Sequence, residues 1–459
     1  MTHTNKQLVS KYSKPVPRYT SYPTAPQFIP VSAPDRQRIN EYIFHRNNEA
    51  RDISIYLHLP FCKSLCWYCG CNTVISRQQE VSDVYLTYLE KELKRLASLM
   101  NSDNKVVQLH YGGGTPTYLS DLQLLQLGKL LNSYLKISSD AEAGVEIDPR
   151  TLTLKKAAAL RKTGFNRASI GVQDVNEDVQ KAINRIQPSY MNRDSFKMLR
   201  DTGFESLNAD LVVGLPLQTM ESFRDTIREA ITYQPDRFAV FNYAHVPWIK
   251  PAQKLLERHP RPDAYLKFEM MHMLAEELSK AGYIAIGMDH FALPNDDLVL
   301  AQLNGTLQRN FQGYSTKDDI DIYGLGVSSI SKVGSMYYQN KPDINEYYTQ
   351  LDEEKLPYHK FYLMSEEDEL RSWIIMRTMC DMQLDFRKLS HRFDIHFRTY
   401  FEEEWDLLRN FEKEGLVELS DANLKITDKG KPFIRNIVSI FDIYLNQGED
   451  NSTRYSKSL

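Results

Sequence analysis

The sequence has no long hydrophobic run and no strong excess of either charge. No stretch approaches the ~20 apolar residues that cross a bilayer as a helix, and residues 1–6 are polar, without an apolar signal segment. We therefore expect a cytoplasmic protein, in a reducing compartment, without a membrane span. The formal net charge of −4 disfavours general nucleic-acid binding, which favours a basic surface.

The rest of the composition is that of a globular protein, with 42% hydrophobic and 25% charged residues. A chain of 459 residues has room for two or three domains of ~100–200 residues. The first ~50 residues show no helical or strand period and are rich in proline and tyrosine. They predict either an arm packed over the main domain or a disordered tail.

Cysteines are few but unevenly placed. Four of the five lie within ten residues, at Cys62, Cys66, Cys69 and Cys71. The Cys-x3-Cys-x2-Cys spacing puts three thiols on one short loop. Three thiols can bind three irons of a four-iron cubane and leave the fourth iron with an open coordination position, whereas a cluster bound only by protein uses four cysteines. An open coordination position marks a site that does chemistry.

Two other uses of clustered thiols are weaker. Disulfides are unusual in a reducing compartment. Zinc sites usually add a second ligand pair further along the chain, but the lone distant cysteine, Cys380, falls in a stretch that predicts a buried helix face. The ligand type and spacing therefore favour an iron–sulfur cluster over zinc.

Short β-rich runs alternate with amphipathic stretches from about residue 53 to residue 247. Six runs predict strands: 53–59, 106–111, 143–147, 168–172, 207–213 and 238–243. This alternation predicts a parallel sheet with helical crossovers. Polar residues gather where the runs end, which is where α/β barrels carry their active sites. We predict an α/β fold, a partial (open) parallel (β/α) barrel, with a doubly wound open sheet as the second choice.

A second unit begins near residue 364. Helical patterns lead into two short alternating runs, 415–419 and 424–427, that predict a hairpin. This order is typical of a winged helix, but the charge balance disfavours DNA, so we expect a packing or substrate-covering domain. The expected division is an N-terminal arm covering the active site (1–47), the partial barrel (48–357), and a mainly helical, winged-helix-like C-terminal domain with the hairpin (358–459).

Several residues at the predicted strand ends are candidates for binding. The run Gly112-Gly113-Gly114-Thr115-Pro116 offers backbone N–H groups without side-chain bulk, which suits either a small charged ligand or a tight turn. Asp210 interrupts an apolar strand, where burial would demand a partner. Glu146 is weaker, because acids are often exposed at such positions. Gln173 and Arg185 carry little weight alone.

Two aromatic and polar stretches have two readings each. Tyr56 and His58 share one face of the strand that leads into Cys62, and they form either plain core or the surroundings of the cluster. Residues 308–314 form either an ordinary surface loop or a recognition loop for a large planar ligand, in which Arg309 pairs a carboxylate.

The cysteine run, followed by a parallel barrel and Gly-Gly-Gly-Thr-Pro, resembles the radical S-adenosylmethionine superfamily. Within it, the segment 17–25, Cys71, Gly287–Phe291 and Arg309–Tyr314 are similar to the oxygen-independent coproporphyrinogen III oxidases, over nearly the whole chain. The related heme chaperones lack the arm and Cys71, which makes that function the second choice. A radical heme-degrading enzyme is the third.

The resemblance implies a [4Fe–4S] cluster on Cys62, Cys66 and Cys69, and two molecules of S-adenosylmethionine. It also implies that Cys71 is required for catalysis without binding the cluster. Tyr68 departs from the phenylalanine of the family member compared, keeping the ring and adding a hydroxyl. The implied contacts are Tyr56, Gly113, Glu146 and Ile330 for the first molecule, and Tyr68, Gly114, Thr115, Gln173, Arg185, Asp210 and Ala244 for the second.

The implied reaction is the oxygen-independent oxidative decarboxylation of two propionates of coproporphyrinogen III to vinyl groups by a 5′-deoxyadenosyl radical, giving protoporphyrinogen IX in heme biosynthesis. A tetracarboxylate substrate on an acidic protein requires a local basic lining; the candidates are Arg18, Arg185 and Arg309, with Gln312 as a further substrate contact. The expected partners are a flavodoxin- or ferredoxin-type electron donor and an unidentified electron acceptor, with no nucleic acid. We expect a monomer.

Overall fold

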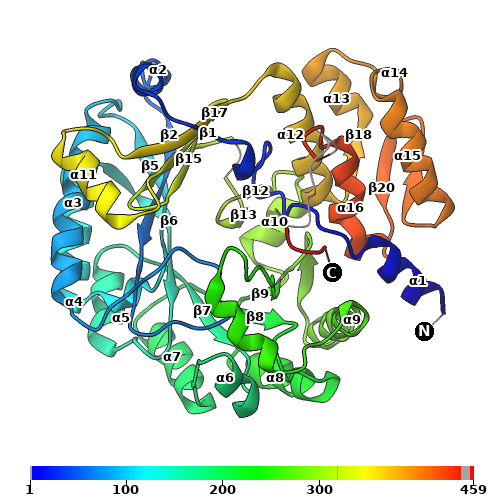
Figure 1. Cartoon of the computed structure of the whole chain (residues 1–459), viewed down its shortest axis with the longest axis horizontal. Coiled ribbons are helices and arrows are strands. Elements are labelled where there is room, and N and C mark those ends of the chain that lie inside the picture. Colours follow the sequence, from blue (N-terminus) through cyan, green and yellow to red (C-terminus); the bar gives the residue numbers. More distant parts are fainter. Residues whose placement is uncertain (1–2, 318, 446–454, 459) are drawn as a thin grey trace.

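A computed structural model describes residues 3–317, 319–445 and 455–458. It shows a large curved sheet with helices along its outer side, and a smaller helical unit beside the open side of the sheet (Figure 1). The outermost residues of the predicted arm and C-terminal domain, 1–2 and 459, lie outside the described residues.

The middle of the large sheet is parallel. Its seven parallel strands are, in order across the sheet, β14 (Asp321–Leu325), β2 (Asp52–Leu59), β5 (Lys105–Gly113), β6 (Lys136–Ile147), β7 (Arg167–Gln173), β8 (Ser206–Val213) and β9 (Arg237–Asn242). All six predicted strands are among them. The alternating runs therefore predicted the parallel core correctly.

Antiparallel strands extend both edges of this core. Beyond β14 come β15 (Ile330–Val333), β16 (Met336–Asn340), β17 (Tyr358–Leu363) and β1 (Ile29–Pro30), and beyond β9 come β11 (His290–Ala292) and β10 (Ile284–Ile286). In the described chain the edge strands β1 and β10 do not pair with each other. The sheet is therefore open, as a partial barrel requires.

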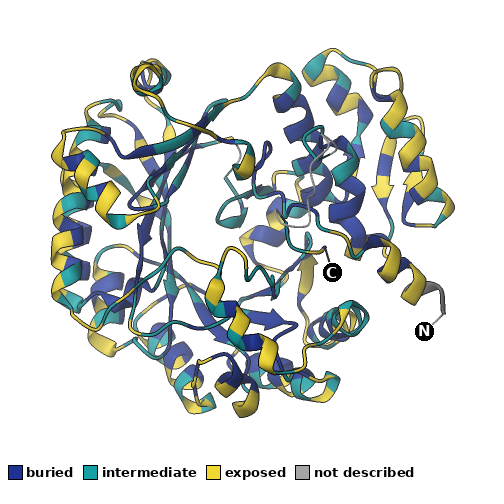
Figure 2. Ribbon diagram, viewed as in Figure 1, coloured by how far each residue is buried: buried dark blue, intermediate teal, exposed yellow. Residues whose placement is uncertain are grey.

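Helices that connect the parallel strands form the outer layer (Figure 1). They are α3 (Glu80–Ala97), α4 (Asp121–Tyr134), α5 (Leu154–Lys162), α6 (Glu177–Ala182), α7 (Ser189–Asp201) and α8 (Met220–Thr232). Helix α9 (Ala264–Lys280) follows β9, α10 (Asp297–Leu303) follows β11, and α11 (Ile344–Asp352) connects β16 to β17. The outer helices are buried on the side facing the sheet and exposed on the other (Figure 2). No described helix is both long and apolar enough to span a membrane.

The expectation that the first ~50 residues lack regular structure is wrong. They contain α1 (His3–Tyr12) and α2 (Ala33–Arg46). Helix α2 begins at a capping box formed by Ser32 and Asp35, and Ile39 and Ile43, four residues apart, are buried. The proline- and tyrosine-rich segment between these short helices dominates the composition and hides their period. That segment packs as an arm, with Tyr19 and Tyr22 buried.

The C-terminal unit is mainly helical, and the predicted hairpin is present. Its elements are α12 (Glu366–Asp381), β18 (Gln383–Asp385), α13 (Phe386–Phe393), α14 (Phe397–Tyr400), α15 (Glu402–Lys413), β19 (Val417–Leu419), β20 (Asn423–Ile426) and α16 (Ile434–Val438). Strand β18, which the sequence did not indicate, pairs with β20 beside the hairpin. The domain limits stay a prediction; β17, just after the limit predicted at 358, is a strand of the large sheet.

The arm is fastened to the C-terminal unit. Leu8, Tyr12 and Tyr19 share a hydrophobic cluster with that unit. Arg435 on α16 donates hydrogen bonds to the carbonyl oxygens of Pro17 (2.9 Å) and Val16. The arm and the C-terminal unit thus form one packed body beside the open sheet.

Candidate active site

The cysteine loop lies at the carboxyl edge of the parallel strands. It follows β2 and runs between two short strands, β3 (Phe61–Cys62) and β4 (Val74–Ile75). Cys62, Cys66, Cys69 and Cys71 all line one cavity of about 380 Å³. The fold therefore brings the loop thiols to the place where α/β barrels carry their chemistry.

Most of the predicted site residues line this same cavity. Besides the cysteines they are Arg18, Tyr68, Gly113, Gly114, Thr115, Glu146, Gln173, Arg185, Asp210 and Ala244. They come from the arm, the cysteine loop and the carboxyl-terminal parts of β5, β6, β7, β8 and β9 with the residues that follow, except Arg185, which lies between α6 and α7. Residues nearly 230 positions apart in the sequence, Arg18 and Ala244, thus meet around one space.

Four predicted residues do not line the cavity. Tyr56 lies directly behind it, next to Glu146, since a Cβ on Gly112 would lie 3.1 Å from the Tyr56 ring and 2.9 Å from a Glu146 oxygen. The hydroxyl of Tyr56 is also 3.2 Å from His58 Nδ1, so the two side chains lie on the same face of the strand, as predicted. Ile330 lies on β15, two strands away from β2.

Arg309 and Gln312 lie in β12 (Gln308–Asn310) and in the turn that leads to β13 (Gly313–Ser315). Arg309 is buried, with Nη1 3.7 Å from Asp289 Oδ1 and its guanidinium over the Tyr314 ring. It lines a different cavity, of about 730 Å³. Gln312 lines a third one, of about 210 Å³, which Glu146 and Asp210 also border. Arg309 therefore borders a different cavity from the cysteines, and its place in a basic lining for the substrate stays a prediction.

The glycine run packs closely against neighbouring residues, and it offers a ligand fewer free backbone N–H donors than its sequence indicates. Gly113 has φ +108°, and a Cβ there would lie 2.6 Å from the His58 ring. The N–H groups of Gly113, Gly114 and Thr115 already donate to Glu146 Oε2 (3.1 Å), Leu59 O (2.9 Å) and Phe61 O (2.9 Å). The expected free N–H groups are thus used within the protein, which disfavours docking of a ligand carboxylate on them.

The two acids of the cavity differ in their ionisation. Burial opposes the charge of Glu146, but His110, whose Nε2 is 3.6 Å from Oε1, and the Gly113 N–H keep its pKa below the ordinary value. Burial raises the pKa of Asp210 to about 7. Glu146 is therefore the ionised partner for a cation, while Asp210 can hold or release a proton near neutral pH.

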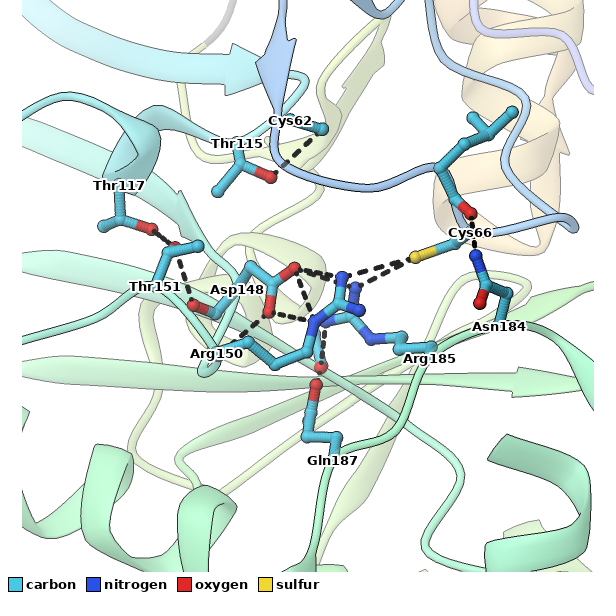
Figure 3. Close-up of polar contacts among 12 residues, drawn as sticks. Cys62, Cys66, Thr115, Thr117, Asp148, Arg150, Thr151, Asn184, Arg185 and Gln187 are labelled. Carbon is cyan, nitrogen blue, oxygen red and sulfur yellow. Dashed lines mark hydrogen bonds and ion pairs between the residues drawn. The ribbon is translucent and has the colours of Figure 1, made fainter. Parts of the chain in front are cut away.

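An ion-pair network reaches the sulfur of Cys66 (Figure 3). Asp148 accepts hydrogen bonds from Arg150 Nε (3.0 Å) and from Arg185 Nη1 (3.2 Å). Both guanidinium groups point at Cys66 Sγ, with Arg150 Nη2 at 3.4 Å and Arg185 Nη1 at 3.6 Å. Arg185 also donates to Gly171 O (2.8 Å). Arg185 thus shares one carboxylate with Arg150 while it lines the cavity, and its place in a basic lining for the substrate stays a prediction.

Arg150 was not predicted. Its only local signal is its place two residues after Asp148, where β6 (Lys136–Ile147) has just ended. Nothing in that stretch indicates that its guanidinium contacts a sulfur 84 positions earlier in the chain.

The donors around the sulfurs fit an iron–sulfur cluster. Besides the two arginines, Thr115 Oγ1 lies 3.3 Å from Cys62 Sγ, and the N–H of Cys71 donates to Cys69 Sγ at 3.4 Å. Hydrogen bonds and cations near sulfur stabilise thiolates. Within the described ranges no three His, Cys, Asp or Glu side chains form a single-ion site, so the arrangement gives no support to the zinc alternative. In a cubane each thiolate binds a separate iron.

Comparisons with known proteins agree with this geometry. Residues 56–230 match the radical SAM superfamily and residues 364–433 match the HemN C-terminal domain. The oxygen-independent coproporphyrinogen III oxidase of Salmonella typhimurium is 42% identical over 96% of this chain and 95% of its own length. The Helicobacter pylori (strain 26695) enzyme of the same name is 41% identical over 98% of both chains.

The fold agrees as well. The solved structure of coproporphyrinogen III oxidase (HemN) from Escherichia coli, a radical SAM enzyme, superposes with a TM-score of 0.89 at 41% identity, covering 93% of this chain and 97% of that one. Identity of this level over nearly the full length of both chains shows the family. The chain belongs to the oxygen-independent coproporphyrinogen III oxidases of the radical SAM superfamily.

Proposed function

We propose that this chain converts two propionate side chains of coproporphyrinogen III to vinyl groups without oxygen, giving protoporphyrinogen IX in heme biosynthesis. The observation that carries the proposal is the single cavity at the carboxyl edge of the parallel strands that three loop thiols, Glu146 and Asp210 all line. Membership of the superfamily implies a [4Fe–4S] cluster and S-adenosylmethionine. When bound, they supply a carbon radical that removes a hydrogen atom from the propionate.

Cys62, Cys66 and Cys69 would hold the cluster, and the hydrogen-bond donors described above would contact the sulfurs that bind it. Glu146 has the charge to accept hydrogen bonds from a nucleoside or an ammonium group. Asp210, fixed by Ser169 and Asn208, can accept from ribose hydroxyls or hold a proton. We assign Tyr56, Gly113 and Ile330 with Glu146 to a first S-adenosylmethionine, and the remaining predicted contacts, including Tyr68, to a second.

The arm and C-terminal unit would shield this chemistry from water. Arg18 reaches from the arm to the carbonyl oxygen of Asn242 and lines the cavity. A radical reacts with whatever is near, so exclusion of solvent and firm positioning of the substrate are what the protein must contribute. We therefore propose that residues 1–47 cover the active site, and that Cys71, which lines the cavity beside Cys69, is the additional cysteine needed for catalysis.

The comparisons do not favour a heme-binding chaperone or a heme-degrading enzyme, because the relatives matched over nearly their full length are oxidases. We further propose that the cluster receives electrons from a flavodoxin- or ferredoxin-type protein, that a separate acceptor takes the electron released with CO2, and that the chain acts as a monomer in the cytoplasm.

The proposal is tested with anaerobically reconstituted protein, S-adenosylmethionine, a low-potential reductant and coproporphyrinogen III. We expect release of two CO2 per substrate and formation of protoporphyrinogen IX. Cys66→Ser should lose both the iron and the activity, whereas Cys71→Ser should keep the iron and lose vinyl formation. Stoichiometric heme binding with no loss of coproporphyrinogen III would sink the proposal in favour of the chaperone function.

A further inference from the structure

A second cavity adjoins the catalytic one at the ends of β8 and β9. It has a volume of about 720 Å³, and its wall includes Gly214, Tyr243, Arg261 and Lys267. Tyr243 lines both cavities. The catalytic cavity alone, at about 380 Å³, is near the lower end of the range for one drug-sized ligand. A tetrapyrrole with four acidic arms requires additional space, and this neighbouring cavity is the space that opens beside Tyr243.

Lys267 is held in the wall of this second cavity. It lies in the first turn of α9, and its aliphatic stem packs on Gly214, where an added Cβ would be 2.7 Å from Lys267 Cδ. Gly214 has φ +90° and follows β8 directly. The residue that follows the strand therefore has no side chain, and the lysine stem occupies the space this leaves.

The ammonium of Lys267 has no counter-ion among the residues that the structure describes. Among residues 3–317, 319–445 and 455–458, no hydrogen bond or ion pair to its side chain is present. Burial, together with the charges of Lys457, Arg435, Arg261 and Arg18, lowers the pKa of Lys267 to about 8. The start of a helix adds further positive potential. A cation that is largely removed from water and surrounded by other cations costs free energy unless an anion joins it.

The acids of the same wall are already engaged. Glu257 Oε1 is 3.0 Å from His245 Nε2, and the carboxylate of Asp263 caps α9 by accepting from Leu266 N at 2.7 Å. His245 is in turn 2.9 Å from the Tyr243 hydroxyl through Nδ1. The acidic side chains of the cavity thus serve its own framework, while Lys267 and Arg261 are left for a ligand.

We infer that Lys267 and Arg261, with Arg18 from the arm, form a carboxylate subsite that holds the two propionates of the tetrapyrrole that do not react. The inference rests on the proposed function. Coproporphyrinogen III carries four propionates, of which two are consumed, so the other two remain as fixed handles through both reactions. A subsite that adjoins the catalytic cavity through Tyr243 would anchor those arms while a reacting arm reaches past Arg18.

Binding of a tetracarboxylate tests this without turnover. The probe is coproporphyrin III, the fluorescent oxidised form of the substrate, titrated into the full-length protein under anaerobic conditions. We expect Lys267→Met to weaken its binding at least tenfold, and Lys267→Arg to restore most of it. Lys280→Met, at the exposed far end of the same helix, is the matched control and should bind like the wild type.

The tetramethyl ester of the same porphyrin separates charge from shape. It should bind wild type and Lys267→Met equally, because it offers no carboxylate. Equal affinity of both proteins for the free acid would overturn the inference, as would an equal loss for the ester. If the methionine variant unfolds, Arg261→Met gives the same test from the rim. Failure of the proposed function would give a different result: wild type would bind the free acid but would form no vinyl groups from coproporphyrinogen III.

Discussion

Replacing Asp210 with asparagine gives a quantitative test of the catalytic cavity. The carboxyl accepts hydrogen bonds from Ser169 Oγ (2.8 Å) and Asn208 Nδ2 (2.6 Å). Burial, and to a lesser degree the charge of Glu146, raises its pKa from 3.8 to about 7. In Asp210→Asn the side-chain oxygen can still accept from Asn208, and the new amide can donate to the Ser169 hydroxyl. The variant therefore removes a charge while the local hydrogen bonds survive.

The sign and size of the effect follow from proton linkage. The folded protein keeps a proton on Asp210 that the unfolded chain releases, so the free energy of unfolding falls as pH rises from about 4 to about 7 and is then constant. A shift from 3.8 to about 7 corresponds to about 4 kcal/mol at ~1.4 kcal/mol per pH unit. The asparagine of Asp210→Asn does not titrate, so the variant does not lose this free energy of unfolding as pH rises. It should be more stable than wild type at pH 8 by up to about 4 kcal/mol.

Calorimetric unfolding at pH 5.5 and pH 8 measures the difference. At pH 5.5 the wild type has already lost about half of this free energy of unfolding. The difference in unfolding free energy between the variant and the wild type should therefore grow by about 2 kcal/mol from pH 5.5 to pH 8. For a chain of this length that is a rise of roughly 2 °C in the melting-temperature gap. Asp225→Asn, on the exposed face of α8, should show no such growth.

The raised pKa of Asp210 would be refuted if the melting-temperature difference between Asp210→Asn and wild type stayed constant with pH. It would also be refuted if the variant were less stable than wild type at pH 8. The same variant tests the assigned role, since equilibrium dialysis should show weaker binding of the second S-adenosylmethionine. Stability and function are thus expected to change in opposite directions, as is common for charged groups held in active sites.

Three further perturbations follow from the geometry. Gly113→Ala should lower the melting temperature more than Gly164→Ala. Both glycines have positive φ, but only at Gly113 would the added Cβ lie against a side chain, 2.6 Å from the His58 ring. Equal shifts in melting temperature would show that the His58 ring can move away without cost. Asp148→Asn leaves the buried guanidinium of Arg185 and the half-buried one of Arg150 without their carboxylate. It should cost about 3–5 kcal/mol in the free energy of unfolding, measured by chemical denaturation, and a loss below 1 kcal/mol would contradict the network. Arg435→Met should release the arm and speed tryptic cleavage at Arg18, whereas unchanged cleavage would mean that the hydrophobic cluster alone holds it.

The sequence predicted the elements that repeat locally. The six parallel strands, the hairpin at 417–426 and the buried face around Cys380 follow from short-range patterns of apolar side chains. The two helices of the arm were not predicted because each is short and the proline-rich segment between them dominates the composition of the first ~50 residues. Strand β18 was missed for a related reason, since three residues carry too little alternation to be recognised.

The sequence by itself determined that three thiols share a loop at a strand end and that the chain resembles a known family, because spacing and motifs are local properties. Only the tertiary structure decided which distant groups meet. It aims Arg150 at Cys66, ties Arg435 to the arm 418 positions away, and turns Arg309 toward Asp289. It also places Lys267 in a cavity wall whose described acids are engaged elsewhere. Such pairings depend on which strands become neighbours and on where the arm packs, and no short stretch of sequence records either.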